Sequence, residues 1–263
     1  MKKLFAIVLK AAFLLPVLAS AQSALDGTWK IDLGQAQLSA KPDVYLLQAG
    51  MYECKTCVPP IRITADGQIH PVTGHPYYDA MSVKVIDDRN IQTTRSKNGK
   101  VVENDKTTVA PDGAAASDEF IDSSATSGAP VTGKSEMSRV ATGPAGSHAI
   151  SGSWRTTKLA NISDNGITFT YKTQGDALNM TTPTGQSFTA KVDGTDAPYN
   201  GDPGTTSVSV KRIGKMTLEE TDKRDGKVIS VTRTVVAANG KTIAIVVHDT
   251  LHGTTSKFVG VKQ

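Results

Sequence analysis

The stretch ADGQIHPVTGHPYYDAMSVKVI (65–86) returns later in the chain as VDGTDAPYNGDPGTTSVSVKRI (192–213), and this repetition decides the fold. A gapless shift of 127 residues lays 66–113 on 193–240, with 17 identities in 48 positions. Two unrelated segments of ordinary composition would share about three. Because two copies are fewer than a solenoid usually needs, the repeat indicates a duplicated domain.

Each copy has the pattern of a series of short strands. Polar and apolar residues alternate in ITFTYKT (167–173), TSVSVKR (206–212) and MSVKVI (81–86), as in strands with one buried face. KTIAIVVHDT (241–250) is more uniformly apolar. About eight or nine strands in the second copy, at intervals of roughly 8–12 residues, favour an antiparallel sandwich or barrel. The predicted fold class is all-β, with two tandem antiparallel β-barrel or sandwich domains related by internal duplication.

The chain is predicted to divide near its middle. Residues 110–152 are rich in Ala, Ser, Thr and Gly, and GPAG (143–146) is the predicted joint between domains. This places the first β domain at 22–145 and the second at 146–263, each of ordinary domain size. The alternative is one continuous sheet, in which this segment is a long loop.

Residues 1–21 have the composition of a secretory signal peptide. A lysine pair precedes a largely apolar run that ends in ASA (19–21), a small-x-small cleavage site. The run is shorter than the roughly 20 residues that span a bilayer, and a lysine interrupts it, so a membrane anchor is not favoured. We expect cleavage before Gln22, no transmembrane segment in the mature chain, and a periplasmic or secreted protein.

Charge does not favour nucleic acid as a partner. The whole chain has 29 basic and 25 acidic residues, and residues 1–21 contain three of the lysines and no acid. Subtracting three leaves 26 basic against 25 acidic residues in the mature chain. A duplex-binding protein needs a concentrated basic face to neutralise phosphates, and no such cluster is evident.

Cys54, Cys57, His70 and His75 have the spacing of a two-cysteine, two-histidine zinc finger. In such a finger both histidines lie on a helix, but here a proline follows each histidine, which disfavours helix. An exported cysteine pair meets an oxidising environment, so a Cys54–Cys57 disulfide is predicted, with no metal and no cofactor. A different metal geometry built from the same four side chains stays open as the alternative.

A G-x-W motif opens each copy, because DGTWK (26–30) returns as SGSWR (151–155). Such a motif at the start of a β-rich unit resembles the start of lipocalin-like (calycin) barrels. The repeated module as a whole is similar to one found in secreted bacterial proteins that have no assigned activity. The resemblance implies that Trp29 and Trp154 are structural residues lying across the closed ends of two barrels.

The resemblance also implies that a basic residue from the last strand covers each tryptophan. Arg139 would do so in the first copy, and Lys257 or Lys262 in the second. The alternative is a pair of β-sandwich-like domains in which each tryptophan is an ordinary core residue.

Catalytic motifs are weak, so an enzyme is not favoured and no catalytic residue is predicted. No histidine recurs at the matching position of the other copy, and no nucleophile elbow, metalloprotease motif or phosphate-binding glycine loop is present. The main hypothesis is an exported binding protein that holds a small hydrophobic molecule. The alternative is a structural or envelope-associated β protein that acts as an interaction surface. The predicted inward residues of the second copy are Phe169, Tyr171, Val208, Val210, Ile243 and Ile245.

Overall fold

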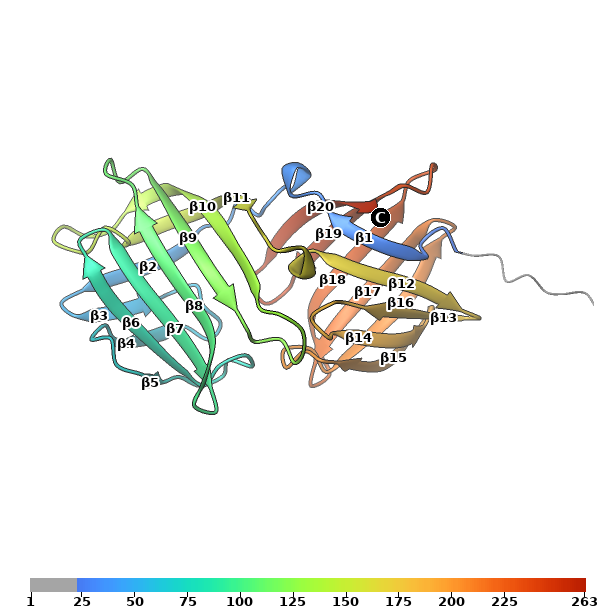
Figure 1. The fold of residues 1–263 in the computed structure, drawn as a ribbon, viewed down its shortest axis with the longest axis horizontal. Coiled ribbons are helices and arrows are strands. Elements are labelled where there is room, and N and C mark those ends of the chain that lie inside the picture. The colour runs from blue at the N-terminus through green and yellow to red at the C-terminus, as the bar shows by residue number, and fades with distance from the viewer. Residues whose placement is uncertain (1–22) are drawn as a thin grey trace, which may run out of the picture.

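The computed structural model describes residues 23–263, so the predicted signal peptide at 1–21 lies outside the described residues. This range contains twenty β-strands and two single-turn 3-10 helices, which confirms the predicted all-β fold. The strands form two ten-stranded antiparallel sheets, each rolled up on itself (Figure 1). Within the described range, no helix is long and apolar enough to cross a membrane.

The first barrel has the strand order β4-β3-β2-β11-β10-β9-β8-β7-β6-β5 and is nearly closed. Its edges approach each other, because Asp66, just after β4, forms an isolated bridge with Lys84 on β6. Its strands are β2 (Asp43–Gln48), β3 (Met51–Cys54), β4 (Ile61–Thr64), β5 (His70–Pro71), β6 (Ala80–Asp87), β7 (Asn90–Lys97), β8 (Lys100–Val109), β9 (Ala115–Asp122), β10 (Val131–Thr142) and β11 (Gly152–Ala160).

The second barrel is fully closed, with the strands in the order β1-β12-β13-β14-β15-β16-β17-β18-β19-β20. The 3-10 helices η1 (Leu33–Gln35) and η2 (Asp164–Gly166) lie outside both barrels in connecting segments. The strands of the second barrel are β1 (Gly27–Ile31), β12 (Thr168–Gln174), β13 (Ala177–Thr181), β14 (Ser187–Lys191), β15 (Asp193–Asn200), β16 (Ser207–Gly214), β17 (Thr217–Arg224), β18 (Lys227–Val236), β19 (Thr242–Asp249) and β20 (Thr254–Lys262).

The sequence repeat is visible strand by strand. The bounds of β6, β7, β8 and β9 become those of β16, β17, β18 and β19 when 127 is added to each residue number. Each barrel therefore uses the same four-strand antiparallel unit, and the duplication explains why the two barrels have the same number of strands.

The first strand of each repeat lies in the barrel of the other repeat. Strand β1 pairs with β12 and β20 in the second barrel, whereas β11 pairs with β2 and β10 in the first. In Figure 1, blue β1 lies beside golden-yellow β12 and red β20, and yellow-green β11 lies among green and blue strands. The segments 32–42 and 161–167 carry the chain across between the barrels. The two repeats have thus exchanged their G-x-W strands.

This exchange divides the chain differently from the predicted boundary at 145/146. The first barrel is built from 43–160, and the second from 27–31 together with 168–262. The GPAG segment at 143–146 belongs to the connection between β10 and β11 of one barrel, not to a joint between domains. The periodicity of a strand shows which face is buried but not which sheet receives the strand, so the sequence pattern could not reveal the exchange.

Each barrel has its own apolar core. All six residues predicted to face inward in the second barrel belong to its core: Val208, Val210 and Ile243 are fully buried, Tyr171 and Ile245 are buried, and partly buried Phe169 packs against them. In the first barrel, buried residues such as Met81, Val83 and Ile91 form a separate cluster around Trp154.

The two barrels meet through the ends opposite their tryptophans, which we call the mouths. Thr126, in the loop between β9 and β10, donates a hydrogen bond to the Gly201 carbonyl oxygen of the second barrel (3.3 Å). Lys41, just before β2, donates to the carbonyl oxygen of His252 in the β19–β20 turn. Both contacts join a loop at the mouth of the first barrel to a loop at the mouth of the second, so the two mouths face each other.

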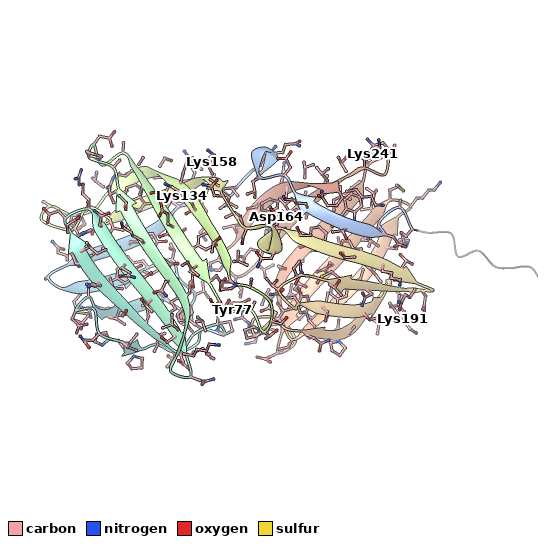
Figure 2. The ribbon with its side chains drawn as sticks, in the orientation of Figure 1. Tyr77, Lys134, Lys158, Asp164, Lys191 and Lys241 are labelled. Atoms are coloured by element: carbon pink, nitrogen blue, oxygen red, sulfur yellow. A yellow bond between two sulfur atoms is a disulfide. The ribbon has the colours of Figure 1, made fainter. Side chains whose placement is uncertain are left out.

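Tyr77 and Gly204, which the 127-residue offset relates, also meet at this interface. A Cβ atom at Gly204 would overlap the Tyr77 hydroxyl oxygen, so the close approach of the tyrosine requires glycine there. Figure 2 shows Tyr77 at the border between the barrels. At this one point, equivalent positions of the two repeats face each other, as they do in a two-fold symmetric dimer.

Candidate functional site

Trp29 and Trp154 occupy equivalent places at the ends opposite the mouths. Both side chains are completely buried. Each indole Nε1 donates to the carbonyl oxygen four residues earlier, that of Leu25 (2.8 Å) and of Ile150 (2.7 Å). Buried indole N–H groups need such a partner. The tryptophans seal the far ends of the barrels, away from the mouths.

A basic residue covers each tryptophan, but the pairs are exchanged relative to the repeats. The Arg139 guanidinium lies 4.0 Å from the centre of the Trp154 ring, and Lys262 Nζ lies 5.1 Å from that of Trp29. Lys257, the other predicted cover, is exposed. Arg139 and Lys262 were therefore correctly predicted to cover a tryptophan. Each covers the tryptophan of the other repeat, because β1 and β11 are exchanged between the barrels.

The two cysteines of the zinc-finger spacing are bonded to each other. Cys54 and Cys57 form the predicted disulfide, with an S–S distance of 2.07 Å. His70 Nε2 lies 2.8 Å from Asp66 Oδ1. In residues 23–263, no group of three or more His, Cys, Asp or Glu side chains could hold a metal ion. A disulfide-bonded pair also lacks the thiolates that zinc requires.

The interior of the first barrel contains a cavity of about 160 Å³. One wall is polar and is formed by β7, β8 and β9 through Thr93, Arg95, Asp105, Thr107 and Asp118. The remaining wall includes Tyr45, Tyr52, Met81, Ile91 and Met137. Since one water needs roughly 10–15 Å³ of such space, a small organic molecule fits.

Arg95 holds the polar wall together. Its Nη1 lies 2.5 Å from Asp105 Oδ2 and 2.8 Å from Glu103 Oε1. The Thr93 hydroxyl donates to the same Asp105 Oδ2 at 2.8 Å. Asp105 is only 7% exposed, yet its other oxygen, Oδ1, has no hydrogen-bond partner among the described residues. An unpaired buried acceptor is costly, and in native proteins it calls for an explanation such as an absent water or ligand.

The carboxyl groups of this wall have raised pKa values. Burial raises the pKa of Glu103 to about 7, against the lowering effect of Arg95. Burial, followed by the charge of Asp105, raises the pKa of Asp118 to about 6. The hydrogen bond that the Thr107 hydroxyl donates to Asp118 Oδ1 (2.7 Å) works in the opposite direction. Both carboxyl groups therefore titrate close to neutral pH.

A second and larger space, of about 370 Å³, lies between the mouths and forms a cleft. The first barrel contributes Thr56 and Leu159, and the second contributes His252, Thr254 and Ser256. Asp43 and Thr156 line both this cleft and the interior cavity. The cavity and the cleft therefore border the same two residues.

The second barrel carries different groups at the matching positions. The repeat offset converts Thr93, Arg95 and Asp105 into Glu220, Asp222 and Thr232. Glu220 and Asp222 alternate with buried Leu218 on β17 and point inward, and the Ser230 hydroxyl donates to Asp222 Oδ2 at 2.6 Å. Burial, and then Asp222, raise the pKa of Glu220 well above its usual range, and burial raises the pKa of Asp222. Two buried carboxyls without a cation favour sharing one proton.

Arg95, Asp105 and Asp118 belong to no sequence motif, and no ligand-binding residue was predictable from the sequence. These residues lie on inward positions of strands that otherwise alternate normally. From the sequence alone, a charged residue in such a strand is expected to be exposed, because burial of a charge is unfavourable without a partner. The one available signal was that the aligned positions carry different charges in the two copies.

No protein-family model matches the chain, and a search of curated proteins finds no match. The functional assignment accordingly depends on the geometry and chemistry of the cavity and the cleft.

Proposed function

We propose that this chain is an exported, non-catalytic binding protein with lipocalin-like domains, which holds one small molecule in the cavity of the first barrel. The observation that carries the proposal is a 160 Å³ cavity with an unpaired buried carboxylate oxygen in its wall, that of Asp105. Pockets of this kind, with apolar walls and a few convergent polar groups, are the usual form of small-molecule sites.

The cleft between the mouths is the proposed entrance. The cleft and the cavity share Asp43 and Thr156 as lining residues, which supports a route from the cleft into the barrel at this point. Export is supported by the signal-like composition of residues 1–21 and by the Cys54–Cys57 disulfide, which is typical of oxidising compartments.

The lining modifies the expected ligand chemistry. A purely hydrophobic molecule would pack well against Met81, Ile91 and Met137. It would offer no hydrogen bond to the polar groups of Arg95 and Asp105 in the same lining. Because buried polar groups without partners are unfavourable, we propose an amphipathic ligand with an apolar part and a hydrogen-bonding head.

Filling the entrance tests the proposal. In Thr156→Trp a large ring would occupy the junction of cavity and cleft, whereas Thr157→Trp places the same ring on the neighbouring, exposed position of β11. We expect native mass spectrometry of the exported protein, or saturation-transfer NMR with a mixture of small fragments, to detect one bound molecule per chain. Thr156→Trp should abolish this binding and Thr157→Trp should retain it. If no fragment binds saturably to the unmodified chain, the structural-surface alternative replaces this proposal.

A further inference from the structure

The charged groups around the cavity of the first barrel do not balance. Glu103 and Asp105 come from β8 and Asp118 from β9, and together they face one guanidinium, that of Arg95 on β7. Asp43, at the start of β2, adds a further carboxyl at the entrance. Once these carboxyls ionise, the interior has more negative than positive groups.

The other titratable groups near this cluster do not restore the balance. Burial raises the pKa of Tyr45, Tyr52 and Tyr78 above the ordinary value, so all three stay neutral. Burial, followed by Arg95, lowers the pKa of His75, so its ring is uncharged at neutral pH. Asp122, at the end of β9, adds negative charge near Glu103. The strands β10 and β11 contribute only uncharged side chains to the lining.

The hydrogen bonds show where a donor is missing. Arg95 uses one nitrogen, Nη1, for both Glu103 and Asp105 Oδ2, and Thr93 bonds to the same Asp105 oxygen. Within residues 23–263 Asp105 Oδ1 receives no donor, although its side chain is nine-tenths buried and lines the cavity. Asp118, on the neighbouring strand, receives one donor, from Thr107. Two adjacent carboxylates therefore have unused acceptor positions.

We infer that the cavity takes a small organic cation, a primary amine on a short alkyl chain; this inference rests on the proposed function and names its ligand class. The ammonium group, with three donors, bonds Asp105 and Asp118. The alkyl chain packs against Ile91 and Met137 and extends towards the cleft. An anion would meet the carboxylates, and a neutral hydrocarbon would leave Asp105 Oδ1 without a donor.

Binding of a cation is linked to the release of protons. With pKa values of about 7 for Glu103 and about 6 for Asp118, these carboxyls are partly protonated in the free protein between pH 5 and 7. A nearby ammonium group favours their ionised forms. Affinity therefore rises with pH across this range and levels off near pH 8, where alkyl amines are still protonated.

Three probes that share one chain and differ in the head group test the inference. Pentylamine, 1-pentanol and pentanoate are titrated separately into the full mature chain at pH 8 and constant ionic strength, and amide resonances are followed by NMR. We expect pentylamine to bind at least tenfold more tightly than the other two, with shifts centred on β7, β8 and β9. At pH 5.5 its affinity should fall at least fivefold.

The matched variants are Asp118→Asn and Asp222→Asn. Asparagine at 118 keeps the acceptor for the Thr107 hydroxyl and removes the charge, so pentylamine affinity at pH 8 should fall at least fivefold. The same change at 222, in the second barrel, should leave it unchanged. Equal or tighter binding of pentanol or pentanoate in the cavity, or no effect of Asp118→Asn, overturns the cation inference while the proposed function stands. If none of the three probes binds in the first barrel, both fail.

Discussion

The two barrels have the same walls and opposite interiors. Strands β6 to β9 and β16 to β19 match residue for residue in their bounds, yet the matching inward positions hold Arg95 in one barrel and Asp222 in the other. Each interior contains one buried carboxylate oxygen without a partner among the described residues, Oδ1 of Asp105 in the first and Oδ1 of Asp222 in the second. The first interior also has an ion pair and a cavity. The second has an apolar core and two adjacent carboxyls on β17.

This contrast separates what the fold requires from what it leaves free. Both barrels keep a tryptophan, a basic cover and alternating apolar strands, because those features close and fill the sheet. The inward polar positions differ, and such positions decide which molecule a barrel can hold. We interpret the second repeat as the part of the chain that completes the first barrel. It contributes β11 to the wall of that barrel, and its own barrel forms one side of the cleft.

The largest expected effect concerns the exchange of the G-x-W strands. Trp29→Ala removes a fully buried ring and its hydrogen bond to the Leu25 carbonyl, and should lower the free energy of unfolding by about 3–5 kcal/mol. Although Trp29 belongs to the first repeat, hydrogen exchange should accelerate in 168–262 and not in 43–142. Faster exchange confined to the first barrel would contradict the exchange of strands. Trp154→Ala is the reciprocal control.

A somewhat smaller effect distinguishes the two interiors. Arg95→Leu leaves Glu103 and Asp105 without their cation, and at pH 8 should cost about 2–4 kcal/mol of unfolding free energy, less at pH 5 where Glu103 is protonated. Asp222→Leu, at the matching position, removes one of two carboxyls and should cost less than about 1.5 kcal/mol. Urea denaturation at both pH values measures the difference. Equal losses in the two variants would mean that the interiors are not electrostatically distinct.

Much of the fold was predictable from the sequence, and the reason is periodicity. Alternation of Val208 and Val210 marked the buried face of β16, and the 127-residue repeat indicated two similar units. The destination of β1 was not predictable, because both repeats carry the same G-x-W motif and the motif does not specify which barrel receives it. The site was missed for a related reason: Arg95 and Asp105 are stabilised by each other across β7 and β8, and a pairing between strands cannot be read from one strand alone.

The smallest stability effect concerns the proton equilibrium of the first interior. Asp118 has a pKa of about 6 in the fold, against 3.8 ordinarily, so it binds its proton more tightly when folded. It therefore stabilises the fold at low pH, and this contribution is lost as pH rises from about 4 through 6. Asp118→Asn lacks this loss and should be more stable than the unmodified chain by about 1–2 kcal/mol at pH 8, with little difference at pH 4. A constant difference at both pH values would show that Asp118 titrates normally.

The central claim is that the interior of the first barrel binds a ligand and the interior of the second barrel does not. A crystal structure of the mature chain soaked in pentylamine at pH 8 tests this most directly. The account predicts one amine in the first barrel, with its nitrogen within hydrogen-bond distance of Asp105 Oδ1 and Asp118, and its chain directed to the cleft at Thr156. An amine bound between Glu220 and Asp222, or a first barrel with only water in its cavity, would contradict it.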